Sequence, residues 1–228
     1  MLGEDYLVVT PDLPGTGKNP ELEQQNLEGY VKWLHGYIAD LGVKPIMVGH
    51  SMGSIIVSHY VEKYPETVAQ DLILMSPILR GPGAKAANMV FNEAVRGVLF
   101  PFSPELKKKI LASKRVSWMI SHSLTADKSK QKAIDEMHYE YAGQFVSARS
   151  LYCDMDISAS NDTKMPLNKR MLVLFGKKDK LSNCKLVRER VREVGAEYFE
   201  FDSAGHLINY ERPEEVAERI REFLGARR

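Results

Sequence analysis

The hydrophobic positions in the first third of the chain alternate between two spacings. Short β-branched runs at residues 6–10, 45–49 and 72–76 predict buried strands, because consecutive apolar residues of this kind suit a covered sheet. Between the runs, residues 22–41 and 55–63 have helical patterning, with apolar side chains recurring three and four positions apart along the first of them. Alternation of strand and helix is typical of a parallel sheet with right-handed crossovers.

The pattern changes between residues 79 and 166. This segment has few strand-like runs, is rich in helix-like sequence and is interrupted by Pro82, Pro101 and Pro104. Its Met and aromatic side chains are expected mostly to pack against one another, with a minority lining an apolar pocket. These side chains are Met89, Phe91, Phe100, Phe102, Trp118, Met119, Met137, Tyr139, Tyr141, Phe145 and Tyr152.

The alternation then resumes, with predicted strands at 171–175 and 197–201 and predicted helices at 185–194 and 213–224. The predicted fold class is α/β, a mostly parallel sheet flanked by helices. Residues 1–78 and 167–228 are expected to form the core, and residues 79–166 a helical cap inserted into it.

Composition narrows the classes of function. The chain has 228 residues, and its 31 Lys and Arg residues balance 30 Asp and Glu residues, for a net charge of +1. No long-range field therefore attracts nucleic acid or anionic lipid. No apolar run approaches the roughly 20 residues that span a bilayer, and the N-terminus does not resemble a secretory signal. A cytoplasmic protein is expected.

The segment from Gly49 to Gly53 carries the strongest chemical signal. It reads Gly-His-Ser-Met-Gly and joins a predicted strand directly to a predicted helix, which is the context of a nucleophile elbow. Ser51 would project its hydroxyl above the sheet, and the backbone N–H of Met52 would donate to an oxyanion. Glycine is expected to be needed at positions 49 and 53, because the sharp turn leaves little room there for a β-carbon.

A serine hydroxyl needs a base, and the base needs an acid to orient it. Asp179 follows the predicted strand at 171–175, and His206 follows the strand at 197–201. The carboxyl ends of parallel strands meet at one edge of the sheet, the edge from which Ser51 also projects. We therefore expect His206 to act as general base and Asp179 to hold its tautomer. His50 is not needed as the base and is expected to help pack the elbow.

These stretches resemble the α/β-hydrolase superfamily, specifically its lid-bearing serine esterase and lipase-like members. Further matching stretches are Pro11-Asp12-Leu13-Pro14-Gly15-Thr16-Gly17 and Glu211-Arg212-Pro213-Glu214. The resemblance implies attack by Ser51 on an ester-like carbonyl of a small molecule, through an acyl-enzyme. Neither a metal nor an organic cofactor is expected: Cys153 and Cys184 show no zinc-ligand spacing. A homo-oligomer is left open.

The chain departs from the family at its beginning. Members usually have two or three earlier strands, the third of which ends in a loop that donates the second oxyanion N–H. Three arrangements follow for the resulting gap beside residues 46–49: an upstream stretch is missing from the sequence, residues 6–10 move over to pair there, or another chain fills the edge. The first is favoured. The alternative function is a non-catalytic ligand-binding or interaction protein on this fold.

Overall fold

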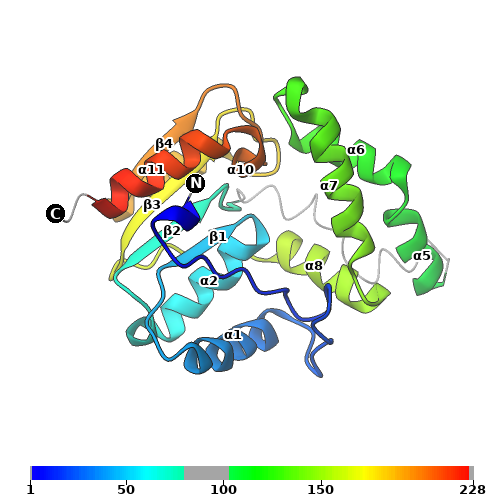
Figure 1. Ribbon diagram of the computed structural model, residues 1–228, viewed down its shortest axis with the longest axis horizontal. Coiled ribbons are helices and arrows are strands. Elements are labelled where there is room, and N and C mark those ends of the chain that lie inside the picture. Colours follow the sequence, from blue (N-terminus) through cyan, green and yellow to red (C-terminus); the bar gives the residue numbers. More distant parts are fainter. Residues whose placement is uncertain (1, 80–102, 226–228) are drawn as a thin grey trace.

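The computed structural model describes residues 2–79 and 103–225, so Met89, Phe91, Phe100 and Phe102 lie outside the described residues. Four strands are present in this part of the chain (Figure 1). They are β1 (Met47–His50), β2 (Asp71–Met75), β3 (Arg170–Gly176) and β4 (Glu197–Phe201). The α-helices are α1 (Leu27–Leu41), α2 (Met52–Lys63), α5 (Pro104–Leu111), α6 (Lys114–Leu124), α7 (Gln131–Gly143), α8 (Ala148–Ser160), α9 (Cys184–Val194), α10 (Ile208–Glu211) and α11 (Pro213–Gly225). Short 3-10 turns are η1 (Leu2–Glu4), η2 (Pro65–Thr67) and η4 (Lys128–Lys130).

All four strands are parallel and lie in the order β1-β2-β3-β4. Gly49 is in register with Leu74, Leu74 with Val173, and Val173 with Tyr198. Because consecutive strands are neighbours and parallel, each crossover returns to the same end of the sheet. The carboxyl ends therefore form one edge, and the predicted α/β class is confirmed.

Helices cover both faces of the sheet. Side chains alternate along each strand, so Leu72 and Leu74 pack with α1, α2 and α9 on one face, while Ile73 packs with α10 and α11 on the other. The two apolar clusters are almost completely buried. This three-layer arrangement gives the strand ends a rigid support.

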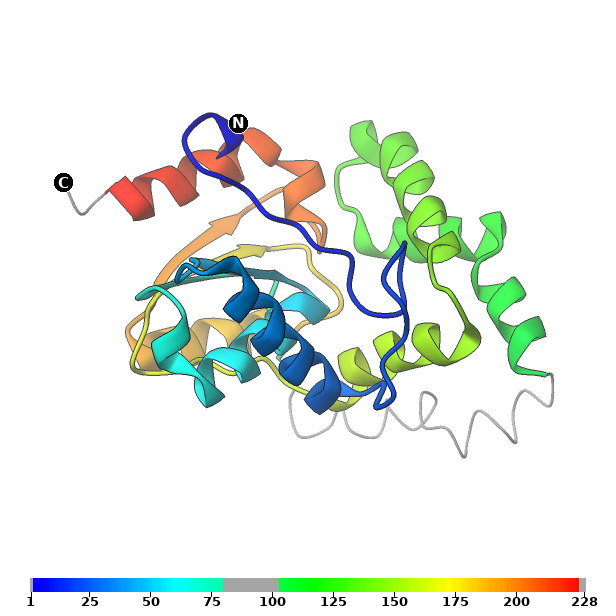
Figure 2. The same cartoon turned by 60° about the horizontal axis from the view of Figure 1, so that its bottom comes forward.

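The predicted strand at residues 6–10 is wrong. These residues form a coil that leads from η1 toward the loop before α1 (Figure 2), and among the described residues β1 pairs with β2 alone. Leu7 is 93% exposed, and Val8 and Val9 are about half exposed. A β-branched run has only a local preference, and without a neighbouring strand its backbone groups have no ladder to join. The arrangement in which residues 6–10 pair beside β1 is therefore contradicted.

The start of α1 also differs from the predicted start at residue 22. Asn26 is the N-cap, and its side chain accepts the backbone N–H of Gly29. Upstream, the N–H of Leu22 is bound by the side chain of Gln25 instead of entering a helix. The helix ends at Leu41, as the patterning over residues 22–41 predicts, and it is capped by Gly42, whose φ of 66° is the left-handed conformation that glycine adopts easily.

Helices α5 to α8, here called the insertion helices, lie between β2 and β3 in the chain. They gather beside the carboxyl ends of the strands in both views (Figures 1 and 2). The last of them, α8, packs on α2, and its Cys153 and Ile157 belong to the same apolar cluster as the core helices. The insertion helices are thus anchored to the α2 side of the sheet.

Candidate active site

Ser51 lies in a sharp turn between β1 and α2. Its φ of 53° and ψ of −120° are strained for a residue with a β-carbon, and its backbone N–H donates to the carbonyl of Met75 at 3.1 Å. Met52 is the first residue of α2, so its N–H belongs to the group that a helix leaves without an intrahelical partner. The turn therefore places two groups at the edge of the sheet: the hydroxyl of Ser51 and the N-terminus of α2.

The three predicted side chains meet at this edge. The Oγ of Ser51 lies 2.7 Å from Nε2 of His206, and Nδ1 of His206 lies 2.7 Å from Oδ2 of Asp179. The side chains of His206 and Asp179 are 2% and 0% exposed. Because an ionised carboxylate only accepts hydrogen bonds, the arrangement places the proton on Nδ1 and leaves Nε2 to accept from the serine hydroxyl.

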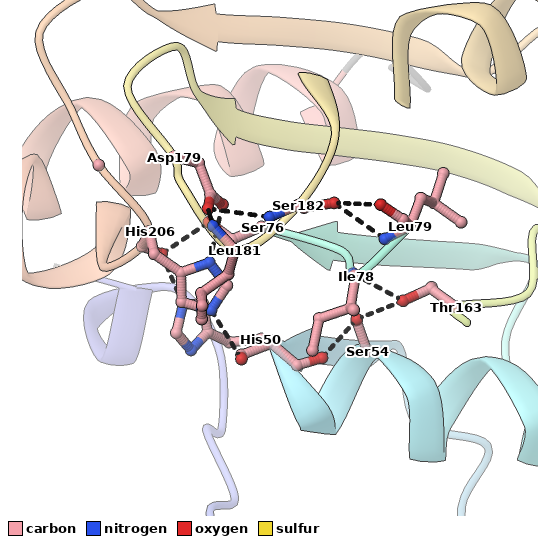
Figure 3. A network of polar contacts seen from close by, with 12 residues as sticks. His50, Ser54, Ser76, Ile78, Leu79, Thr163, Asp179, Leu181, Ser182 and His206 are labelled. Carbon is pink, nitrogen blue, oxygen red and sulfur yellow. Dashed lines mark hydrogen bonds and ion pairs between the residues drawn. The ribbon is translucent and has the colours of Figure 1, made fainter. Parts of the chain in front are cut away.

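Backbone donors hold Asp179 in place. Its Oδ1 accepts the N–H of Leu181 at 2.7 Å and that of Ser182 at 3.3 Å, while Oδ2 faces His206 (Figure 3). Each carboxylate oxygen thus has a donor. This fixes the orientation of the acid and leaves one oxygen directed at the imidazole.

The loops that carry the acid and the histidine are joined through their backbones. Lys178 donates its N–H to the carbonyl of Ala204 at 3.0 Å. A β-carbon on Gly176 would lie only 1.9 Å from the carbonyl oxygen of Gly205, so the end of β3 touches the histidine loop directly. Only glycine permits this approach, and the contact sets the separation of Asp179 and His206.

The carbonyl of His206 accepts two further hydrogen bonds. One comes from the hydroxyl of Ser76 at 2.7 Å and the other from Nε2 of His50 at 3.0 Å (Figure 3). Burial, and to a smaller extent the neighbouring His206, lower the pKa of His50 to about 4. His50 is therefore a neutral donor near pH 7, and it anchors the backbone of His206 as well as packing beside the elbow.

The two elbow glycines have different surroundings. A β-carbon on Gly49 would lie 2.5 Å from a methyl of Val57 and 2.6 Å from the carbonyl of Gly53, so no side chain fits there. At Gly53, nothing outside the backbone of α2 lies within 4 Å of the corresponding position. The expected crowding is present at Gly49. At Gly53 the expectation is wrong, because residue 53 lies on the first turn of α2 and its β-carbon position is open.

A second polar network connects the elbow to the insertion. Ser54 on α2 shares a hydrogen bond of 2.7 Å with Thr163, whose Oγ1 also accepts the N–H of Ile78 at 3.0 Å (Figure 3). Thr163 follows α8 and Ile78 follows β2, so the network ties together the points where the chain leaves and rejoins the sheet. It steadies the turn that carries Ser51.

Sequence patterns do not mark Ser76 and Glu211 as parts of this region. Ser76 stands at the end of a predicted strand, where a hydroxyl has no distinguishing pattern, and its φ of 44° is visible only in the structure. Glu211 stands out in the sequence only as part of a family-like stretch. Its carboxylate contacts the loop of His206, as described below, through backbone groups that leave no trace in the residue types.

Two further observations concern ligands and membranes. In the described residues, His, Cys, Asp and Glu side chains do not form any group of three suited to hold a metal ion. No helix in residues 2–79 and 103–225 combines the length and the apolar character needed to cross a bilayer.

Comparison with known proteins identifies similar chains. Residues 2–219 match the model of the "Alpha/beta hydrolase family". The chain is 24% identical over 231 residues to a pyrethroid hydrolase of Sphingobium wenxiniae, covering 97% of this chain and 79% of that protein. It is 22% identical over 230 residues to (E)-2-((N-methylformamido)methylene)succinate hydrolase of Acinetobacter baylyi, covering 96% and 80%.

Solved structures share the fold. An esterase from Exiguobacterium antarcticum superposes with a TM-score of 0.73 at 14% identity, over 94% of this chain and 80% of that one. A 2-hydroxy-6-oxo-6-phenylhexa-2,4-dienoate hydrolase from a Rhodococcus strain gives 0.69 at 20% identity, over 98% and 81%. With the parallel sheet and the match across nearly the whole chain, these findings show that the chain belongs to the alpha/beta hydrolase family.

Proposed function

We propose that the protein is a serine hydrolase that cleaves a carboxylic ester, or a related acyl bond, of a small hydrophobic substrate. The observation that carries the proposal is the continuous chain of hydrogen bonds from Ser51 Oγ through His206 to Asp179, each 2.7 Å long. A hydroxyl, an imidazole and a carboxylate in this order form the apparatus that activates serine as a nucleophile.

In the proposed first step, Ser51 Oγ attacks the carbonyl carbon while Nε2 of His206 takes the hydroxyl proton. The negative charge that develops on the carbonyl oxygen is stabilised by the N–H of Met52 at the start of α2. Collapse of the tetrahedral intermediate expels the alcohol, which receives the proton from His206. An acyl group then remains on Ser51.

In the second step, His206 takes a proton from a water molecule, which attacks the acyl carbonyl. Collapse releases the acid, and the proton returns to Ser51. Asp179 stabilises the imidazolium in both steps while its two backbone donors keep it oriented. These steps use protein side chains, the backbone N–H of Met52 and water.

The insertion helices would act as a cap that selects the substrate. They carry exposed apolar side chains, among them Trp118 and Met119, and they gather beside the strand ends that hold Ser51 (Figure 1). An uncharged, apolar substrate suits such a surface better than a sugar or a nucleotide. The hydrolase and esterase names of similar proteins support the reaction class.

A fluorophosphonate probe tests the proposal. We expect covalent labelling of Ser51, located by peptide mass spectrometry, together with turnover of short p-nitrophenyl esters. Ser51→Ala and His206→Ala should each lower kcat by on the order of 10³-fold or more. His59→Ala removes an imidazole from α2 away from the site and should leave the rate nearly unchanged.

The alternative reading predicts a different result. If the protein only binds a ligand, an apolar ester would bind without turnover and Ser51 would not be labelled. A folded protein with that behaviour would overturn the hydrolase proposal.

A further inference from the structure

The insertion helices reach the loop of His206 through the segment after α6. The backbone N–H of His206 donates to the carbonyl of Leu124 at 2.8 Å. A β-carbon on Gly205 would lie 2.4 Å from that same carbonyl oxygen and 2.9 Å from the backbone nitrogen of Ala126. The two segments therefore touch backbone to backbone, with no space for a side chain at position 205.

The carboxylate of Glu211 binds both segments. It is the last residue of α10 and is 1% exposed. Its Oε1 accepts the N–H of Gly205 at 2.8 Å, and its Oε2 accepts the N–H groups of Ala126 at 2.9 Å and Asp127 at 2.6 Å. A buried carboxylate needs such donors to offset its lost hydration, and here they come from both segments at once.

A second link lies nearer the surface. Arg212 donates to the carboxylate of Asp127 and to the hydroxyl of Ser203. The hydrogen bond from this guanidinium, followed by those from Ser129, lowers the pKa of Asp127 to about 2. The ion pair connects the same two segments, but solvent weakens pairs of this kind, so the buried carboxylate of Glu211 carries the greater part of the connection.

We propose that Glu211 is a positioning residue for His206, and that residues 124–127 belong to the fixed frame of the active site and not to a moving lid. The role rests on the proposed function, because it matters only where His206 is the base. The imidazole must reach Ser51 and Asp179 at the same time. A displacement of about 1 Å at such a group can lower a rate about 100-fold.

Glu211→Gln is the first test. Its amide has one accepting oxygen, and its NH₂ group would face a backbone N–H that needs an acceptor. We expect the rate constant for phosphonate labelling of Ser51, and kcat for a short ester, to fall about 10- to 100-fold, with KM changed less than about twofold. Glu214→Gln removes an exposed carboxylate from the first turn of α11 and should leave both values unchanged.

The pH profile separates positioning from a loss of folding. The charged groups around His206 are Asp179, Glu211 and the Asp127–Arg212 pair, with His50 neutral. Removal of the Glu211 charge disfavours the imidazolium, so the acid limb of the rate profile should move to lower pH. A purely structural role predicts a lower Tm with an unchanged rate constant and an unchanged limb.

Gly205→Ala approaches the same contact from the other side. Its methyl group would push against the carbonyl of Leu124 while the carboxylate of Glu211 stays in place. We expect a similar fall in kcat with little movement of the acid limb. Each kcat is divided by the concentration of Ser51 sites that the phosphonate labels, so protein that has lost its fold does not lower the value. Wild-type labelling combined with wild-type rate constants in both variants would overturn the proposal, whereas failure of the wild type to label concerns the proposed function instead.

Discussion

Two serines in the described part of the chain adopt a positive φ, and both serve the same site. Ser51 has a φ of 53° and Ser76 a φ of 44°, and they are the two non-glycine residues of this kind in the described ranges. Each costs on the order of 1 to 3 kcal/mol, which persists because β1, α2 and β2 fix their ends. Ser51 directs its hydroxyl at the imidazole of His206, and Ser76 directs its own at the carbonyl of the same residue. The strain at these two serines lowers local stability, and it is the cost of holding His206 in position.

Asp154 is another residue that the fold holds at a cost in stability, here by disfavouring its ionised form. Burial raises the pKa of this α8 carboxyl from 3.8 to about 6, partly opposed by the hydrogen bond from Tyr141 at 3.1 Å. The folded protein therefore holds the proton more tightly than the unfolded chain does. Between about pH 4 and 6, stability falls as the pH rises, because the folded state must give up a proton that the unfolded state has already lost.

Asp154→Asn should remove this effect. The amide oxygen still accepts from Tyr141 but carries no charge, so we expect the variant to be more stable than wild type at pH 7.5 by on the order of 1 to 2 kcal/mol. At pH 4 the two should be nearly equal. Chemical denaturation at both pH values measures the difference. Asp156→Asn, an exposed neighbour on the same helix, is the control, and a loss of stability at pH 7.5 in Asp154→Asn would contradict the argument.

At the scale of elements, the elbow depends on the close packing of α2 against β1. Gly49→Ala would place a methyl 2.6 Å from the carbonyl of Gly53 and 2.7 Å from Cα of Ser54, so α2 must shift. We expect a loss of about 1 to 3 kcal/mol in unfolding free energy, with loss of phosphonate labelling because the shift moves Ser51.

Gly53→Ala is the matched substitution four residues away. Its methyl meets nothing outside α2, and alanine favours a helix over glycine by roughly 0.5 to 1 kcal/mol. We therefore expect equal or greater stability, measured by thermal unfolding. If the two variants were destabilised equally, the packing explanation for the elbow would be wrong.

At the scale of the whole molecule, no strand in residues 2–79 and 103–225 pairs with the outer edge of β1, and this exposed edge has a clear physical consequence. Val48 on this strand is 44% exposed, and the coil at residues 6–10 adds Leu7 at 93%. Unpaired backbone groups beside apolar side chains favour association between copies. Val48→Lys should reduce concentration-dependent light scattering, whereas Leu167→Lys, at a position that is 77% exposed and away from this edge, should not. Equal effects of both substitutions would indicate general solubility and not the edge.

Much of the site could be predicted because its functional groups lie in short sequence motifs. A glycine-flanked serine between strand and helix, and an acid and a histidine after later strands, fix the residue types and the chain order. The parallel sheet then brings their loops to one edge, as the distances of 2.7 Å show. The helix and strand periodicities likewise predicted β1 to β4 to within about two residues at each end.

By itself, the sequence determined the alternation of strands and helices, the turn at Ser51, and which residues are proposed as base and acid, because these depend on local pattern and side-chain chemistry. Only the tertiary structure decided that residues 6–10 stay outside the sheet, since a strand exists through its neighbour. It also decided that Gly53 is uncrowded, and that Ser76, His50 and Glu211 hold the loop of His206. Those side chains bind backbone groups of the loop. Every residue carries such groups, so the residue types in the sequence do not predict the contacts.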